Sequence, residues 1–238
     1  MIGSEAALKA QLNQLPERLV TMFKNIQLTF AMVALAAVGV LHAQDAKQIT
    51  QERAEAERTV PRLAEVLELQ PGMTVADVGS GGGAITVVLG KWLGPSGRVF
   101  ATDITENALR ETREYAKREG LTNVTVLEGA AAATNLPPAC CDAIFMRDVY
   151  HHITEPEAFD KSLAASLKPG GRLAVIDFLA RPGSKVFPGV NPNRGGHGIP
   201  PAIVVSEVSA AGFTHVKTAD HWPEEKDTLF LVLFRKPS

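Results

Sequence analysis

The segment with the clearest chemical character is Val75–Gly83, which reads VADVGSGGG. Asp77 ends an apolar run, and three glycines follow it at alternate positions. Glycines there let the backbone turn sharply and let a ligand approach the main chain without a Cβ in the way. The start of the following helix presents unpaired N–H groups that favour a negative group. Taken alone the pattern is ambiguous, because Gly79, Gly81 and Ala84 also satisfy the fingerprint of a dinucleotide-binding loop.

Two acidic residues beside this loop narrow the choice of ligand. Asp103 ends the second apolar run, RVFATD, where a carboxylate can accept hydrogen bonds from both hydroxyls of a ribose. Asp77 adds a second negative charge, which would repel a diphosphate and attract a ligand that carries an amino group and a sulfonium. Each acid also has a purely structural alternative. Asp77 could cap the glycine turn, and Asp103 could cap the next helix, because Glu106 lies three residues further on.

The elements that must position these residues alternate along the chain. Short apolar runs separated by helical segments indicate a parallel sheet with helices on both faces. The runs are Thr74–Val78, Arg98–Thr102, Val124–Leu127, Ala143–Met146 and Leu173–Phe178, with a tight turn at Lys168–Gly171 before the fifth. Helices are predicted at Gly82–Leu93, Glu106–Glu119, weakly at Ala130–Asn135, and at Pro156–Leu167 and Pro201–Ala211. Phe213–Thr218 and Thr228–Phe234 are predicted to be a closing pair of strands. Ahead of the sheet, residues 51–67 have helical spacing, and Pro61 is expected to kink that helix or to open a second one.

Several motifs in a fixed order resemble those of class I S-adenosylmethionine-dependent methyltransferases. The resemblance runs from about Gln51 to the end of the chain and is closest to small-molecule methyltransferases with a double histidine after strand four. It implies an α/β, Rossmann-like, doubly wound and mostly parallel seven-stranded sheet with an antiparallel closing strand. It also implies S-adenosylmethionine as cofactor and a small-molecule methyl acceptor as partner. The motifs are Asp77-x-Gly79-x-Gly81-x-Gly83, Asp103, Leu136-Pro137, Asp142-Ala143-Ile144-Phe145, Tyr150-His151-His152 and Leu167-Lys168-Pro169-Gly170-Gly171.

The same resemblance implies which residues bind the cofactor. The methionine moiety would meet the backbone of the glycine loop, the ribose would meet a carboxylate, and the adenine would lie between the second and third strands. The residues implied are Asp77, Gly79, Ser80, Gly81, Gly83, Asp103, Ile104, Gly129, Ala130 and Arg147. The chain departs from the family at 130–133, where four alanines stand in place of the acid that many relatives carry.

A general base is needed only if the methyl acceptor carries a proton at neutral pH. The candidates are Asp148, Tyr150 and His151, which follow strand four. The histidines could instead brace the loop or cap a helix end. The irregular segment 180–200 is expected to cover the substrate, and its basic residues would suit an anionic or polar acceptor.

No metal site is expected from the sequence. The candidate ligands His151, His152, His197 and His221 lack paired spacing on one helix. The adjacent Cys140 and Cys141 are expected to fill the hydrophobic approach to strand four as small apolar residues, with a role in binding a soft metal or an arsenic substrate as a weaker alternative.

The N-terminal region predicts a separate extension, residues 1–43, before a methyltransferase domain at 44–238. Leu28–Leu41 is a 14-residue stretch without charge. That is short of the roughly 20 residues of a spanning helix and matches the apolar region of a secretory signal peptide. Export to the periplasm or medium, or membrane association through residues 26–43, is therefore expected. The alternative is a helix packed on a cytoplasmic domain.

Composition and charge limit the remaining function classes. The 238 residues carry a net charge of −2, so they lack the basic excess typical of nucleic-acid-binding proteins. Two rival functions stay open. One is an NAD-dependent oxidoreductase that uses the dinucleotide fingerprint, and the other is an exported, non-catalytic methyltransferase-like binding protein. The second rival draws support from the expected export, because S-adenosylmethionine is not expected to be supplied outside the cytoplasm.

Overall fold

The computed structural model describes residues 48–180 and 183–238. The predicted extension, including Leu28–Leu41, lies outside the described residues. The chain divides into two compact units, Met1–Gln51 and Glu52–Ser238, and the second carries the whole sheet.

The second unit is built on one seven-stranded sheet with strand order β3-β2-β1-β4-β5-β7-β6. Every neighbouring pair from β3 to β5 is parallel, and β7 is antiparallel to both β5 and β6. This confirms the predicted fold class. The strand order reverses between β1 and β4, and ligands of open parallel sheets bind at such a switch point, at the carboxyl ends of the strands. The strands are β1 (Thr74–Val78), β2 (Arg98–Asp103), β3 (Val124–Glu128), β4 (Cys141–Arg147), β5 (Leu167–Phe178), β6 (Thr214–Trp222) and β7 (Leu229–Arg235).

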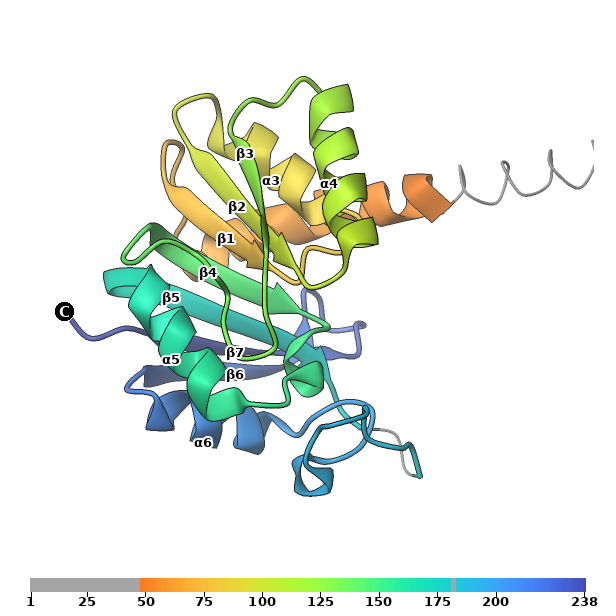
Figure 1. The fold of residues 1–238 in the computed structure, drawn as a ribbon, viewed down its shortest axis with the longest axis vertical. Coiled ribbons are helices and arrows are strands. Elements are labelled where there is room, and N and C mark those ends of the chain that lie inside the picture. The colour runs from red at the N-terminus through yellow and green to blue at the C-terminus, as the bar shows by residue number, and fades with distance from the viewer. Residues whose placement is uncertain (1–47, 181–182) are drawn as a thin grey trace, which may run out of the picture. The chain divides into compact units, whose positions relative to one another are not determined.

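Helices cover both faces of the sheet (Figure 1). A helix over 48–67 and α3 lie on one face, where Leu63 and Leu89 pack with Val75 in one apolar core. α5 and α6 lie on the other face, and their buried side chains share a second core with β4. The labelled helices are α3 (Ala84–Leu93), α4 (Glu106–Arg118), α5 (Pro156–Ser166) and α6 (Pro201–Ala210), with short 3-10 turns η1 (Tyr150–His152) and η2 (Pro192–Arg194).

Two local predictions were wrong. No second helix opens at Pro61: the helix over 48–67 continues through this residue, because Leu63 and Leu67 on its apolar face are buried and their packing outweighs the lost backbone hydrogen bond. The weak helix predicted at 130–135 does not form. An isolated bridge joins Ala130 to Ala133 instead, as expected for a segment too short to nucleate a helix.

The approach to β4 also differs from the prediction. Cys140 and Cys141 are joined by a disulfide rather than lying as separate thiols, although Cys141 is buried as expected. β5 begins at Leu167, opposite Cys141, and takes in the predicted turn at Lys168–Gly171. A register shift between Cys141 and Ala143 accommodates the extra residues.

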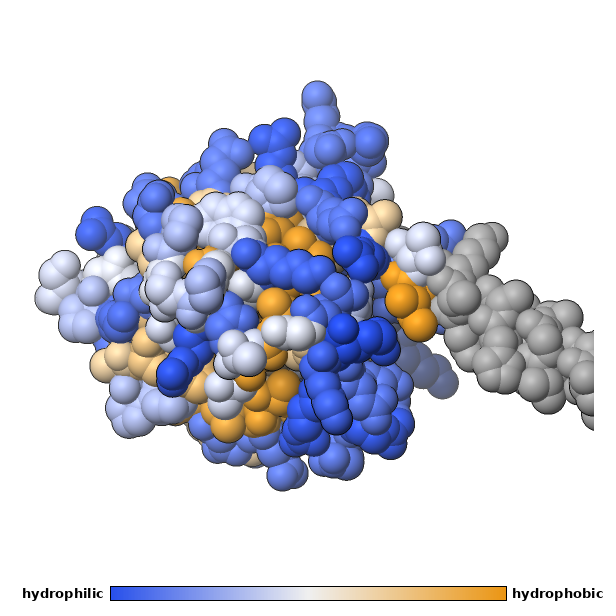
Figure 2. Space-filling model, turned by 90° about the horizontal axis from the view of Figure 1, so that it is seen from above, coloured by the Kyte–Doolittle hydropathy of each residue, from blue (hydrophilic) through white to orange (hydrophobic). Residues whose placement is uncertain are grey.

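The surface of the domain is mainly hydrophilic in the view from above, with smaller hydrophobic areas between the polar side chains (Figure 2). Across residues 48–180 and 183–238, no helix combines the length and apolar character that crossing a membrane would require.

Candidate active site

The loop after β1 owes its shape to its glycines. The Gly79 and Ser80 amides both donate to the carbonyl of Thr102, at 2.7 and 2.9 Å, which ties the loop to β2. Gly79 has a φ of 79°, and a Cβ there would lie 2.2 Å from the side chain of Val149. Packing therefore requires glycine at this position, whatever ligand binds.

Gly81 and Gly83 have different surroundings. A Cβ on Gly83, the residue that caps α3, would lie 2.8 Å from the Thr112 hydroxyl. A Cβ on Gly81 would meet nothing within 4 Å, although its φ of 53° is also left-handed. Gly83 is thus needed for packing between helices, whereas Gly81 faces open space that a ligand can use.

A pocket of about 250 Å³ opens at this loop and is called here the glycine-loop pocket. Five predicted cofactor residues line it, together with residues from the helix over 48–67 that the sequence did not single out. The lining residues are Asp77, Gly79, Ser80, Gly81 and Arg147, and also Glu52, Glu55, Ala56, Gly82, Ala84 and Ile85. The Ser80 hydroxyl oxygen is buried and has no hydrogen-bond partner within the described part of the chain.

Asp77 is the acid at the floor of this pocket. Its side chain is 3% exposed, and one carboxylate oxygen accepts a hydrogen bond of 2.6 Å from the Thr86 hydroxyl. Burial, with a contribution from the nearby negative charge of Asp103, raises the pKa of Asp77 to about 7, against the lowering effects of Thr86 and Arg147. A cationic group in the pocket would stabilise the ionised form.

Asp103 holds the loop from the end of β2. Its Oδ2 accepts from the Gly81 amide at 3.1 Å, and its Oδ1 accepts from the amide and hydroxyl of Thr105 at 3.0 and 2.9 Å. The cap of α4 is Thr105, whose hydroxyl accepts from the Ala108 amide. The alternative that Asp103 caps this helix is therefore wrong.

The residues predicted to meet the adenine lie beside Asp103, away from the glycine-loop pocket. Ile104 is 68% exposed. The Gly129 amide donates to the Asp103 carbonyl at 2.9 Å, and Ala130 bonds to Ala133. The predicted cofactor residues thus lie at, or just after, the carboxyl ends of β1, β2, β3 and β4.

Arg147 and Asp148 lie side by side at the end of β4. The guanidinium of Arg147 pairs with Glu55 and lies 3.5 Å from Oδ2 of Asp148. Asp148 has a left-handed φ of 59°, and burial raises the pKa of its carboxyl. Its Oδ1 is buried and unpartnered among the described residues.

Asp148 also lines a second cavity, of about 900 Å³, formed largely by the ends of β5, β6 and β7. Apolar side chains and polar groups share its walls. They are Asp148, Phe178, Leu179, His197, Pro201, Asp220, His221, Thr228, Leu229 and Phe230. Arg147 therefore lines the glycine-loop pocket, and the next residue, Asp148, lines the second cavity.

The structure places Tyr150 away from both pockets. Its ring is fully buried in the core, and its hydroxyl donates to Asp160 at 2.8 Å. Burial, followed by the charge of Asp160, raises the pKa of Tyr150. A phenol in this position cannot reach a substrate, which corrects its nomination as a general base.

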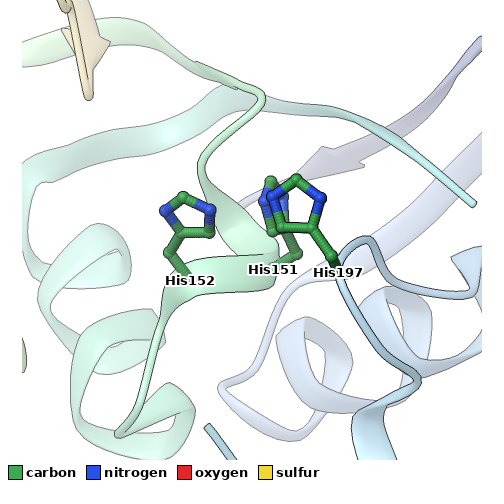
Figure 3. Close-up of side chains that lie close together, drawn as sticks. All are labelled: His151, His152 and His197. Atoms are coloured by element: carbon green, nitrogen blue, oxygen red, sulfur yellow. The ribbon is translucent and has the colours of Figure 1, made fainter. Parts of the chain in front are cut away.

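His151 is held by an acid that the sequence analysis missed. Asp177, at the end of β5, accepts from the His151 amide at 3.1 Å and lies 2.8 Å from its Nδ1. His152 stacks on Phe187 with ring centroids 4.3 Å apart, and His197 completes a group of three imidazoles (Figure 3). Burial, followed by the neighbouring histidines, lowers the pKa of His152.

The segment 180–200, whose basic residues were expected to face the substrate, contributes His197 to the second cavity but not Arg194. His197 lines the cavity wall. Arg194 is buried, where its guanidinium pairs with Glu207 at 2.8 Å and donates to the carbonyl of Ile153. Its charge is therefore neutralised within the fold and does not face a substrate, contrary to the expectation for this basic residue.

Comparison with known proteins shows similarity to methyltransferases at the level of family, sequence and structure. A family model described as a methyltransferase domain matches residues 69–186. The ubiquinone/menaquinone biosynthesis C-methyltransferase UbiE of Yersinia pestis is 34% identical over 120 residues, which are 49% of this chain and 48% of that protein. The chain thus spans about half the length of the curated relatives it matches.

Solved structures extend the similarity over most of the chain. A SAM-dependent methyltransferase from Aquifex aeolicus has a TM-score of 0.59 at 27% identity, over 77% of this chain and 97% of that one. The [4+2]-cyclase SpnF has a TM-score of 0.62 at 18% identity, over 76% of this chain and 81% of that one, and shows likeness of fold alone.

Proposed function

Because the chain belongs to the class I S-adenosylmethionine-dependent methyltransferases, we propose that it transfers a methyl group from S-adenosylmethionine to a small-molecule acceptor. One observation carries the proposal: of two consecutive residues at the end of β4, Arg147 lines the glycine-loop pocket and Asp148 lines the second cavity, so a donor and an acceptor bound there would meet at the end of β4.

The residues of the glycine-loop pocket fit the cofactor. The open space at Gly81 admits a ligand against the backbone, and the buried Ser80 hydroxyl lacks a partner among the described residues. Asp77, when ionised, places a negative charge in the pocket, which suits an amino group and a sulfonium and disfavours a diphosphate, while Asp103 can accept hydrogen bonds from ribose hydroxyls. This electrostatic argument also weighs against the NAD-dependent oxidoreductase.

The second cavity fits a small acceptor. Its volume of about 900 Å³ falls within the range of small-molecule sites. Phe178, Leu229 and Phe230 would contact an apolar body, while Asp148 and His197 offer polar contacts. Intermediates of ubiquinone and menaquinone biosynthesis, the pathways named for the curated relatives, are the first acceptors to examine.

When bound, S-adenosylmethionine supplies a methyl group attached to a sulfonium, and the sulfur is a good leaving group because it departs as a neutral thioether. The protein has to align the acceptor with that methyl group and keep water out. For an acceptor that carries a proton, Asp148 is the proposed recipient, because it lines the second cavity and burial raises the pKa of its carboxyl. Asp148 is therefore the proposed general base, and Asp177 would hold His151 beside it.

The test compares two glycine variants by calorimetric titration with S-adenosylmethionine, S-adenosylhomocysteine and NAD. Gly81→Val places a branched side chain in the open space at the pocket. Gly212→Val is the matched control, since Gly212 also has a positive φ and would meet nothing within 4 Å, but does not line the pocket.

Gly81→Val should abolish cofactor binding, whereas wild type and Gly212→Val should bind S-adenosylmethionine and not NAD. Unchanged affinity in a folded Gly81→Val protein would refute the placement of the cofactor. Transfer of a labelled methyl group to the acceptor panel, lost in Asp148→Asn for protonated acceptors only, then tests the activity and the proposed base.

Residues 1–43 remain proposed as a segment for export or membrane association, supported by the uncharged Leu28–Leu41 stretch. Fractionation of cells that express the full chain and a form starting at Gln44 tests this. Identical distribution of the two proteins would refute it.

A further inference from the structure

Three histidines converge outside the glycine-loop pocket, and one of them, His197, lines the second cavity (Figure 3). We propose that His151, His152 and His197 bind a divalent transition-metal ion, with Zn²⁺ as the probe that tests it. The proposal goes beyond methyl transfer and does not depend on it, because the ligands and their distances are independent of the cofactor residues.

The spacing of the three side chains suits a single ion. One potential ligand atom from each residue lies within 4.8 Å of the others. Nitrogen ligands at 2.0–2.1 Å from a tetrahedral zinc ion are separated by about 3.4 Å, so the widest pair has to close by about 1.4 Å. His197 is exposed and His152 is half-buried, so these two rings have room for that adjustment.

Two ring nitrogens in the cluster lack partners. Nε2 of His151 and Nε2 of His152 are both buried and form no hydrogen bond to any described residue. His151 as a whole is only 3% exposed. Buried polar atoms are normally satisfied, and a metal ion would satisfy both of these at once.

Asp177 orients the His151 ring so that its Nε2 can bind a metal ion. Its carboxylate accepts from Nδ1 of His151, which places the hydrogen on that nitrogen and leaves the lone pair of Nε2 free. The same carboxylate accepts from the amides of His151 and Phe178, so its position is fixed by three contacts. Metal-binding histidines commonly donate their other nitrogen to a carboxylate in this way.

The backbone that carries His197 is anchored beside the other two histidines. The His197 amide donates to the Ser184 hydroxyl at 3.1 Å, and the next-but-one amide, from Ile199, donates to the Phe178 carbonyl at 2.9 Å. A Cβ on Gly198 would lie 2.7 Å from the Ala180 nitrogen, which shows how closely the two segments pack. The cluster is therefore built into the fold from two distant parts of the chain.

The composition of the site selects the class of metal. Three imidazoles and no carboxylate ligand favour zinc, copper, nickel or iron over Mg²⁺ and Ca²⁺, which prefer oxygen. Three protein ligands leave a fourth position on a tetrahedral ion. Because His197 lines the second cavity, that position could take water or an oxygen or sulfur atom of the methyl acceptor.

The test titrates metal-free full-length protein with Zn²⁺ against a chromophoric chelator, in the absence of S-adenosylmethionine. His152→Ala and His197→Ala remove one ligand each, and Asp177→Asn weakens the support of His151. His215→Ala is the matched control, because His215 is exposed on β6 and bonds to Thr218. Co²⁺ uptake, followed by visible absorption, reports the coordination geometry.

Wild type and His215→Ala should bind one Zn²⁺ per chain, with no competition from Mg²⁺. Each ligand variant should bind at least about tenfold more weakly, and Asp177→Asn about 10–100-fold more weakly. His197→Ala is the decisive variant, since the residue is exposed and its loss should leave the fold intact. Unchanged zinc affinity in folded His197→Ala, equal loss in His215→Ala, or no stoichiometric binding by wild type would overturn the proposal.

Discussion

Replacing Asp77 by Asn should make the cofactor-free protein more stable, by an amount that grows with pH. Burial raises the pKa of Asp77 from 3.8 to about 7 in the folded protein. The folded state therefore holds this proton more tightly than the unfolded state. The stabilisation of the folded state by this bound proton is complete below pH 3.8 and is lost as the pH rises through about 7.

The interval between these two pKa values sets the magnitude. At 1.36 kcal/mol per pH unit, ionising the buried carboxyl costs about 4 kcal/mol of unfolding free energy once the pH exceeds 7. Asn avoids this cost, and its amide oxygen can still accept the hydrogen bond from Thr86. The advantage of Asn should thus grow from near zero at pH 4 to about 4 kcal/mol at pH 8.

Urea unfolding of both proteins between pH 4.5 and 8.5, followed by circular dichroism, measures this difference. Burial also raises the pKa of Asp160 to about 7, but that residue is present in both proteins and cancels. Asp220→Asn, at an exposed site, controls for the loss of a carboxylate. A stability difference for Asp77→Asn that does not change with pH would refute the reasoning.

Three further outcomes follow from the site and the core. Asp103→Asn should weaken S-adenosylmethionine binding roughly tenfold and Asp103→Ala up to about a hundredfold, measured by calorimetry, as charge-assisted bonds to the ribose are lost. Asp103→Asn should melt close to wild type, whereas Asp103→Ala should also lose thermal stability, because it can accept none of the hydrogen bonds from Gly81 and Thr105; unchanged affinity in both variants would contradict the ribose contact. Tyr150→Phe should lower the unfolding free energy by about 1–3 kcal/mol by leaving buried Asp160 without its donor, and should not change single-turnover methyl transfer. Removal of residues 1–43 should leave the melting temperature near the full-length value, and a loss of several degrees would mean that this segment stabilises the domain.

The sequence alone determined the order of the elements and the position of the glycine loop. β1 has the predicted bounds, Thr74–Val78, because a buried strand between turn residues is a local pattern. The loop and Asp103 were also predictable, since they follow directly from strand ends and a parallel sheet brings those ends to one edge. Pro61 shows the limit of local rules, because the buried Leu63 and Leu67 keep its helix continuous.

Only the tertiary structure decided which side chains meet and which are buried. Glu55 reaches Arg147 from a helix far away in sequence, and Tyr150 points into the core where the motif suggested an exposed base. His197 joins His151 because the chain returns from β5 to the end of β4. Spacing along one helix or strand encodes local contacts, whereas contacts between distant segments depend on packing of the whole sheet and carry no local signal. For that reason the sequence predicted the glycine loop, whereas the spacing of His151, His152 and His197 did not predict that they lie together.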